Sequence, residues 1–326
     1  MKISVIVSVR NNPDICKCIE SFEASSYPNK ELIIVNDGSQ DHTLDVIRRY
    51  SHHYIDCRTH VGPAVARNKG AQVAVGQVLF FIDSDAVLYR DTLSQVALFL
   101  QAHPQCQGAT AVWDKEPLEE TFFSHLKAIE TNTLFMHYFK NSFGANGQAI
   151  YRNTFLKFGG FSSAFKRADA EDFNLGLDLF REHIEIPIVP SIIIRNGFPK
   201  TFWQGVVKYF RRAYLRSSAL KRFKLGNGNL PAENSHNSKK LILVYVLSFS
   251  LVVMTPIFFY LEARYLLLCI ILWFYLARHI LKAFWKEKGF AFFLRATPIY
   301  FLLCAFIGCG GILGHFFLSR EGEGGD

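Results

Sequence analysis

The sequence predicts an α/β protein with a doubly wound, mostly parallel sheet, followed by C-terminal transmembrane helices. Short β-branched runs alternate with helical patterns in the first half, and these runs are apolar at almost every position. Strands of this kind are typical of parallel sheets that helices cover on both faces. Hydrophobic residues make up 50% of the 326 residues, which is high for a purely soluble protein. The sheet and the membrane region therefore rest on separate observations.

The expected strands and helices alternate up to about residue 82. Strands are expected at residues 2–9, 31–35, 53–57 and 78–82, and helices at residues 13–25, 41–51 and 62–75. In such sheets ligands bind beyond the carboxyl ends of the strands. The loops that follow these four strands are therefore where we expect functional side chains.

The charge balance changes near residue 200. Residues 1–199 carry 19 basic and 22 acidic side chains, whereas residues 200–326 carry 17 and 6. Residues 200–240 read as a basic amphipathic segment that lies in a lipid headgroup region, with a soluble amphipathic helix as the alternative. A basic and apolar second half does not resemble a nucleic-acid-binding module, so no nucleic-acid partner is expected.

Three hydrophobic segments are expected within the transmembrane region 241–319. Residues 241–261 and 296–319 lack charged side chains and exceed the ~20 residues that span a bilayer. Residues 265–285 reach that length only if Arg278 and Lys282 extend toward the headgroups. Three spans keep the basic residues between the last two segments on the cytosolic side, although a re-entrant hairpin plus one span would also do so.

These segments predict a multi-pass protein of the cytoplasmic membrane. The apolar stretch Ile3 to Val9 is too short for a signal peptide, so residues 1–199 are expected to form a catalytic domain that faces the cytosol. Residues 320–326 form a short tail.

Carboxylates follow the second and fourth expected strands. Asp37 stands in the loop Val35 to Ser39, where it could face a ligand, although this loop taken alone is better explained by an ordinary Asn-Asp-Gly turn. Asp83 and Asp85 follow the fourth strand two residues apart. Two carboxylates so close favour a divalent cation with phosphate partners between them.

Three further segments carry candidate functional residues. Arg67 lies near the start of a small-residue helix and could hold a phosphate or a base edge, or could be a surface arginine. A glycine-rich turn, Gly144 to Gly147, precedes a short strand. The acid cluster Asp169, Glu171 and Asp172 opens a helix, where it could complement the helix dipole or supply a general base.

Taken in order, these motifs resemble the family 2, A-type glycosyltransferases over roughly residues 1–200. The motifs are VNDGS, GPAVARNKGA, IDSDA and GGF followed by AEDFNLGLDL. The resemblance implies a nucleotide-diphospho-sugar donor and a lipid-linked or membrane-proximal acceptor, with membrane lipids as further partners. It also implies a place in cell-envelope polysaccharide or glycolipid synthesis.

The resemblance also implies a role for each candidate residue. Asp37, Arg67, Asp83 and Asp85 would bind the nucleotide-sugar, and Asp85 would hold Mg²⁺ or Mn²⁺. Asp172 would be the general base with Glu171 beside it. The turn that contains Gly144, Asn146 and Gly147 would shape the acceptor side.

The expected reaction is one direct displacement that inverts the anomeric centre, because the sequence offers no clear carboxylate nucleophile for a retaining mechanism. The Gln-x-x-Arg-Trp segment of processive members is absent from the sequence, which favours single sugar additions. A nucleotidyltransferase-like enzyme is one alternative, but the loop from Arg10 to Pro13 lacks the glycines that it would need. A catalytically degenerate membrane scaffold is the other alternative, and the intact carboxylates argue against it.

Overall fold

The computed structural model describes residues 1–50, 52–139, 144–162, 171–184, 186–225, 235–258 and 263–317. The chain forms two compact units. The first contains Met1–Asp114 and Lys140–Gly197, and the second contains Lys115–Phe139 and Phe198–Asp326. The chain therefore leaves the first unit after Asp114 and returns to it at Lys140.

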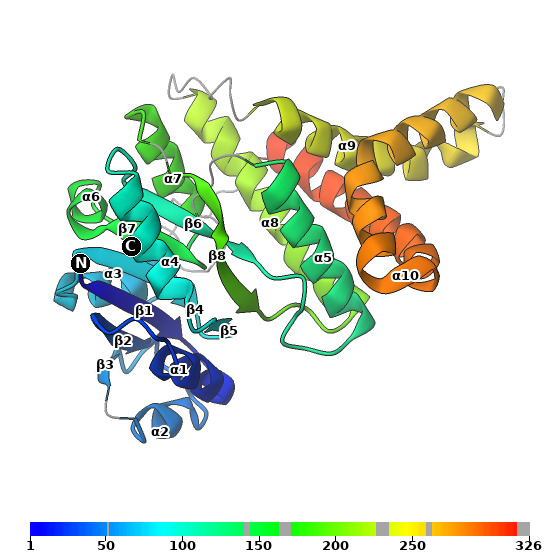
Figure 1. The fold of residues 1–326 in the computed structure, drawn as a ribbon. Helices are drawn as coiled ribbons and strands as arrows, with labels where there is room; N and C mark the ends of the chain where they lie inside the picture. Colours follow the sequence, from blue (N-terminus) through cyan, green and yellow to red (C-terminus); the bar gives the residue numbers. More distant parts are fainter. Residues whose placement is uncertain are drawn as a thin grey trace. The chain divides into compact units, whose positions relative to one another are not determined.

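The first unit is built on an eight-stranded mixed sheet with the strand order β3-β2-β1-β4-β7-β6-β8-β5 (Figure 1). The strands are β1 (Ile3–Val9), β2 (Lys30–Asn36), β3 (His53–Asp56), β4 (Val78–Asp83), β5 (Ala86–Leu88), β6 (Gly108–Trp113), β7 (Gln148–Tyr151) and β8 (Ile188–Asn196). Strands β1 to β4 pair in parallel, and β8 is parallel to β6. Strand β7 is antiparallel to β4 and β6, and β5 is antiparallel to β8. The sheet is therefore mixed, with its parallel pairs concentrated in the half that the sequence predicts.

Helices cover both faces of this sheet, as a doubly wound fold requires. They are α1 (Cys16–Glu23), which follows the 3-10 turn η1 (Pro13–Ile15), α2 (Thr43–Ile47), α3 (Pro63–Val73), α4 (Thr92–Ala102), α6 (Arg152–Lys157) and α7 (Glu171–Arg181). Helices α1, α2 and α4 contribute to one buried layer, and α3, α6 and α7 contribute to the other. The first four strands and the first three helices lie where the sequence predicts them, with ends that differ by up to four residues.

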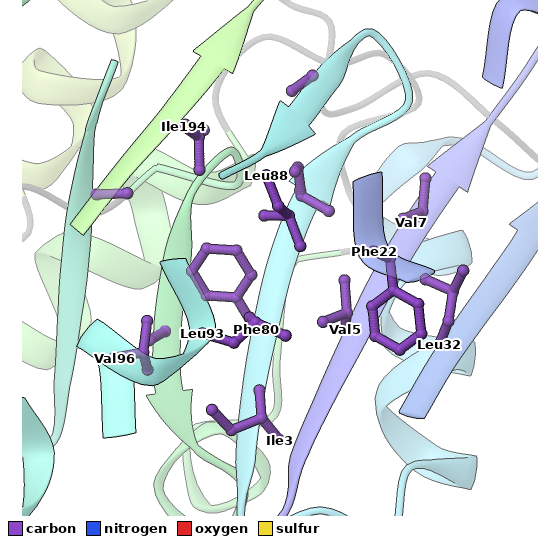
Figure 2. Close-up of a cluster of buried hydrophobic side chains, with 14 of the residues drawn as sticks. Ile3, Val5, Val7, Phe22, Leu32, Phe80, Leu88, Leu93, Val96 and Ile194 are labelled. Carbon is purple, nitrogen blue, oxygen red and sulfur yellow. The ribbon is translucent and has the colours of Figure 1, made fainter. Parts of the chain in front are cut away.

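The alternation of side chains along each strand separates the two layers. In β1, Ile3, Val5 and Val7 pack in the layer that contains Phe22 of α1, as Figure 2 shows, whereas Ile6 packs in the layer of α3. Successive side chains of a strand point to opposite faces, so a strand that is buried on both faces must be apolar at every position. This explains the continuous apolar runs of the sequence.

The described residues of the second unit form four helices. They are α5 (Phe122–His137), α8 (Phe202–Leu225), α9 (Ser235–Phe258) and α10 (Ala263–Phe316). Leu126 and Ile129 of α5 are buried in one cluster with Val244 of α9 and with Trp273 and Tyr300 of α10. From the sequence, residues 115–139 are expected within the domain 1–199. The structure groups them with the C-terminal helices, because the apolar face of α5 packs there.

Helix α10 is interrupted at Gly289, whose φ of 83° and ψ of 177° are not helical. Among the described residues one helix, Leu266–Phe316, is long and apolar enough to cross a membrane, and Lys240–Val253 is a shorter apolar helix. The predicted segment 241–261 falls on α9, and 265–285 and 296–319 fall on the two arms of α10. The ends of the first and third segments and the tail lie outside the described residues.

Glycines bring α8 and α10 close together. A Cβ atom at Gly310 would lie 2.5 Å from the carbonyl oxygen of Phe210, and one at Gly314 would lie 2.1 Å from that of Tyr214. Small residues four apart allow two helix backbones to approach in this way. These glycines therefore fix how α8 packs on the second arm of α10.

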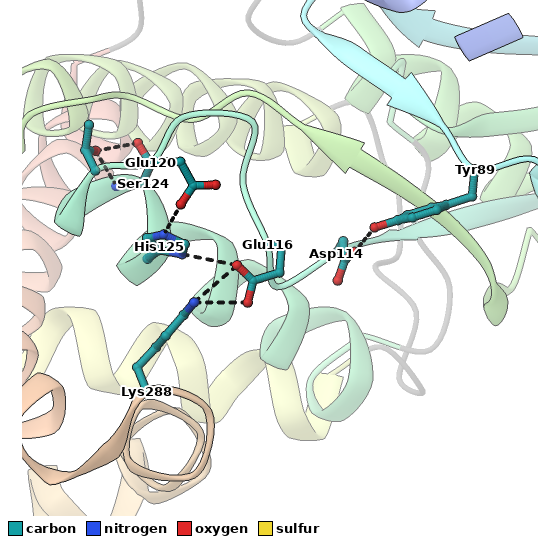
Figure 3. Close-up of polar contacts among 8 residues, drawn as sticks. Tyr89, Asp114, Glu116, Glu120, Ser124, His125 and Lys288 are labelled. Carbon is teal, nitrogen blue, oxygen red and sulfur yellow. Dashed lines mark hydrogen bonds and ion pairs between the residues drawn. The ribbon is translucent and has the colours of Figure 1, made fainter. Parts of the chain in front are cut away.

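A network of ion pairs connects residues 115–125 with α10 near Gly289. Lys115 Nζ lies 2.7 Å from Glu287, and Lys288 Nζ lies 3.0 Å from Glu116. His125 lies between Glu116 and Glu120, at 3.6 and 3.1 Å (Figure 3). In these two lysine–glutamate pairs, residues 115–125 supply one cation and one anion, and α10 supplies the other two. Figure 3 also shows the hydrogen bond from Tyr89 to Asp114 in the first unit.

Candidate active site

The candidate site lies at the carboxyl edge of the sheet in the first unit. Strands β1 to β4 are parallel, and β7 is antiparallel to β4, so the residues before β7 lie beside the residues after β4. The Gly147 amide donates to the Phe81 carbonyl at 2.9 Å, which fixes that position. The loops after β2 and β4 and the turn Gly144 to Gly147 therefore meet at one edge, as the topology rule predicts.

Asp37 is buried at the end of β2 and organises the loop before α3. Its Oδ1 accepts hydrogen bonds from the backbone amides of Val61 (2.6 Å) and Gly62 (3.2 Å). Its Oδ2 lies 2.9 Å from Nδ1 of His60. The carboxylate thus holds residues 60–62, which lead into the helix that carries Arg67.

Gly38 allows this loop to approach the end of β2. Its φ is 64°, and a Cβ atom there would lie 2.4 Å from the backbone carbonyl carbon of Thr59. Only glycine adopts such a conformation at little cost. Asp37 and Gly38 therefore work together, one by hydrogen bonding and the other by leaving space.

Arg67 is a buried cation that pairs with the end of β4. Its side chain is 5% exposed, and its NH2 group donates to Asp83 Oδ1 at 2.8 Å. The guanidinium also lies 5.8 Å from the ring centroid of Phe161. Phe161 is held in turn by Asn68, whose side chain bonds both the backbone amide and the carbonyl of Phe161 at 2.9 and 2.7 Å. The structure thus excludes the reading of Arg67 as a surface arginine.

Asn146 joins three elements at this edge. Its Oδ1 accepts from the Asp83 amide at 3.1 Å, and its Nδ2 donates to Asn196 at the end of β8 at 2.7 Å. Its carbonyl accepts from the indole nitrogen of Trp113 at 3.2 Å. The next residue, Gly147, has a φ of 80°, which the turn into β7 requires. Asn146 therefore positions the loop that follows β4.

Asp172, at the start of α7, lies against the same turn. Its Oδ2 accepts from the Ala145 amide at 3.1 Å, and a Cβ atom at Gly144 would lie 3.7 Å from that oxygen. Glu171 is the first residue of α7, and its side chain lies outside what the structure describes. Asp169 also lies outside the described residues. Hydrogen bonds thus connect Arg67 with Asp83 and Asp83 with Asn146, and the neighbouring Ala145 amide bonds the Asp172 carboxylate.

Asp85 stands across Ser84 from Asp83. Its carbonyl accepts from the Gly197 amide at 2.8 Å, and Ser84 accepts from the side chain of Asn12 at 3.1 Å through both its carbonyl and its hydroxyl. Burial raises the pKa of the nearby Cys18 thiol to about 12, and the negative charges of Asp85 and Asp83 add to this rise. Both carboxylates therefore lie close enough to the Cys18 thiol to raise its pKa.

The residues at this edge fit a divalent cation that a bound substrate also coordinates. Among the residues that the structure describes, no three His, Cys, Asp or Glu side chains gather to enclose a metal ion. Mg²⁺ commonly binds one or two carboxylates and takes its other ligands from water and substrate phosphates. Asp85, which is exposed in the loop after β4, is the carboxylate that would hold such a cation.

No sequence motif singles out His60, Asn12, Asn68 or Asn196. His60 and Asn12 stand in loops, Asn196 ends β8 and Asn68 lies in the middle of α3, and each contacts a residue that is distant along the chain. The expected signal for such residues is weak, because asparagine and histidine are common in turns. Their roles become visible only when the loops meet at the sheet edge.

The chain is similar to a known family and to proteins named as glycosyltransferases. The model of the family described as Glycosyl transferase family 2 matches residues 4–172. A glycosyltransferase of Escherichia coli (strain K12), YibD, whose function is uncharacterised, is 35% identical over 105 residues, or 30% of each chain. The poly(ribitol-phosphate) beta-glucosyltransferase of Bacillus spizizenii is 33% identical over 102 residues, which are 28% of this chain and 16% of that protein. The matched segments therefore span less than a third of these two relatives.

A solved structure shares the fold along most of the chain. It is the mannosyltransferase PcManGT from Pyrobaculum calidifontis in complex with GDP-Man and Mn²⁺, with a TM-score of 0.60 and 17% identity. The comparison covers 97% of this chain and 87% of that one.

Proposed function

The chain belongs to glycosyltransferase family 2, and from this membership we propose that it transfers a sugar from a nucleotide-diphospho-sugar to a lipid-linked or membrane-proximal acceptor. The proposed reaction depends on a divalent cation and inverts the anomeric carbon in a single addition. Family membership favours this reading over the nucleotidyltransferase and scaffold alternatives.

The donor is assigned to the loops after β2 and β4 and to α3. Asp37 orders residues 60–62 for the nucleotide, and Arg67 contacts the base or the diphosphate. Asp83 lies near the ribose, and Asp85 holds the cation. When bound, Mg²⁺ or Mn²⁺ neutralises the charge that develops on the departing diphosphate. The similar PcManGT structure contains GDP-Man and Mn²⁺, which supports a donor and a cation of these classes.

The acceptor is assigned to the region of Asp172 and the turn Gly144 to Gly147. Asp172 removes the proton from the acceptor hydroxyl while the acceptor oxygen forms its bond to the anomeric carbon. The bond from that carbon to the diphosphate breaks, and its electron pair leaves with the nucleotide. Glu171 lies beside the base, and the turn with Gly144, Asn146 and Gly147 shapes the acceptor side.

One observation carries this proposal. The series from Arg67 through Asp83 and Asn146 to the turn that bonds Asp172 joins residues of the donor and acceptor sides by contacts of 2.8 to 3.1 Å. A general base must lie at a fixed distance from the reacting carbon, and small displacements reduce the rate strongly. A series of short hydrogen bonds between the two sides meets that requirement.

The membrane assignments belong to the same proposal. Residues 1–199, apart from residues 115–139, would be the cytosolic catalytic domain, residues 200–240 an interfacial segment, and residues 241–319 a multi-pass membrane region of three spans. The similar Bacillus enzyme acts on poly(ribitol-phosphate) by its name, which supports a product in cell-envelope polysaccharide or glycolipid synthesis.

The test uses the full chain in membranes with a panel of GDP- and UDP-sugars. We expect transfer to an extractable lipid or glycan from one donor, loss of transfer with a chelator and recovery with Mg²⁺ or Mn²⁺. NMR of the product should show the anomeric configuration opposite to that of the donor. Transfer that persists in the chelator would contradict the role of the cation, and retention of configuration would contradict the role of Asp172.

A further inference from the structure

Basic side chains from three helices meet at one place in the second unit. We define the basic cluster as His137 in the last turn of α5, Lys240 of α9, and Arg278, His279 and Lys282 of α10. The other four members are the charged neighbours of His279. The rings of His137 and His279 stack at a centroid distance of 5.0 Å and an angle of 23°. The hydrogen bond from Tyr138 to the Leu276 carbonyl, at 3.2 Å, holds the end of α5 against α10 at this point.

The cluster differs from the other charged groups of α10 in its partners. Within the described part of the chain, no carboxylate pairs with Lys240, Arg278 or Lys282. Arg278 instead donates to the Tyr275 carbonyl at 2.7 Å and lies 4.3 Å from the centre of its ring. Close to Gly289, in contrast, Glu287 and Lys288 of the same helix are both in ion pairs. Like charges repel one another, so an anion bound at the cluster would be favourable.

An apolar surface adjoins the cluster. Lys240 directly precedes the apolar part of α9, and Arg278 follows the apolar part of the first arm of α10. Between these limits some large side chains are buried, and those that are 37% to 60% exposed include Ile242, Leu243, Val246, Leu267, Leu268, Ile271, Leu272 and Tyr275. Exposed apolar surfaces of this extent mark sites for lipid or protein partners. Cations at one end of such a surface match a molecule with an anionic head and a hydrocarbon tail.

From this arrangement we propose that the basic cluster binds the phosphate headgroup of an anionic membrane phospholipid, whose acyl chains cover the exposed apolar side chains of α9 and α10. The site shares no residue with the nucleotide-sugar site at the sheet edge. A small soluble anion would explain the cations alone, whereas a phospholipid accounts for both the cations and the apolar surface.

The experiment measures lipid binding to the full chain in an uncharged detergent. Dissociation constants are determined for phosphatidylglycerol and for phosphatidylcholine with the same acyl chains. We compare the wild type with Arg278→Gln/Lys282→Gln and with the control Lys17→Gln/Lys286→Gln. The control removes the same charge from two exposed lysines outside the cluster.

We expect phosphatidylglycerol to bind the wild type more tightly than phosphatidylcholine. Each basic group near an anionic lipid contributes about fivefold in affinity, so the double variant should bind phosphatidylglycerol about 30-fold more weakly. The control should change this affinity less than threefold. Inorganic phosphate at the same concentration should not displace the lipid.

Three results would overturn the proposal: equal affinity for the two lipids, an equal loss in the control, or displacement by inorganic phosphate. Circular dichroism checks the fold of the double variant, and Lys282→Gln alone, with an expected fivefold loss, replaces it if it does not fold. Nucleotide binding is measured on the same samples and should be unchanged. A failure of the proposed reaction is thereby separated from a failure of the lipid site.

Discussion

Replacement of Asp172 by asparagine isolates the general base from the rest of the site. Asp172 is half-buried at the start of α7, and its Oδ2 accepts the Ala145 amide at 3.1 Å. The asparagine side chain has the same shape, and its amide oxygen can accept the same hydrogen bond. The variant therefore keeps the contact that orients the side chain and loses only the ability to take up a proton.

The expected changes in stability and turnover follow from the retained hydrogen bond and the lost basicity. A typical hydrogen bond contributes about 1 kcal/mol to stability, and this one is retained, so the unfolding free energy should change by less than that. General-base catalysis contributes about 10²–10⁴ in rate, or roughly 3–5 kcal/mol in the activation barrier. Asp172 does not contact the donor in the proposed arrangement, so the affinity for the nucleotide-sugar should change less than twofold, roughly the scatter of such measurements.

The assay compares three variants at saturating donor in membranes. Asp172→Asn should lower kcat, Asp178→Asn on the exposed side of the same helix should leave it unchanged, and Glu171→Gln should have the smaller effect of a neighbour. Donor affinity is measured separately by titration. Turnover of Asp172→Asn near the wild-type rate would refute the assignment, and loss in Glu171→Gln alone would move the base by one residue.

Three further predictions concern other parts of the chain. Asp85→Ala should abolish transfer and leave the circular dichroism spectrum unchanged, and residual metal-dependent transfer would contradict its role as a cation ligand. Gly38→Ala should weaken nucleotide binding about 5- to 30-fold in a titration. The added Cβ meets the backbone of Thr59, and the positive φ costs ~1–2 kcal/mol. Unchanged affinity would show that the loop accommodates the added methyl group. Lys127→Met should lower the unfolding free energy by about 3–5 kcal/mol, because it leaves the buried Glu130 unpaired. The double variant Lys127→Met/Glu130→Leu should lose much less stability. Equal losses of the two variants in thermal unfolding would refute this expectation.

The sequence predicts the first half of the sheet well for a physical reason. Strands such as β1 and β4 are buried on both faces, and their uninterrupted apolar runs distinguish them from neighbouring helices. Strand β5 has only three residues, and β8 has buried and exposed positions intermixed, so neither produces such a signal. The mixed character of the sheet therefore remains invisible until the strands pair.

In the candidate site, too, some residues could be predicted from the sequence and others could not. The carboxylates Asp37, Asp83 and Asp85 could be found from the sequence because each stands close after an apolar strand. The contacts of Asp37 with residues 60–62 could not be found, because they depend on how closely the loop approaches at Gly38. Local patterns report which residues lie at the edge, and tertiary contacts decide which of them face a ligand and which hold a loop.

The position of α5 between β6 and β7 has a consequence for the order in which the chain folds. The ribosome completes α5 and both flanking strands before it makes the helices that bury Leu126 and Ile129. During synthesis this helix must remain exposed or be shielded by another partner until α9 and α10 emerge. A fragment that ends at residue 199 would keep α5 permanently in this state, and its aggregation would report on the uncovered helix and not on the stability of the sheet. Removal of residues 115–139 from such a fragment is therefore the direct route to an isolated catalytic unit.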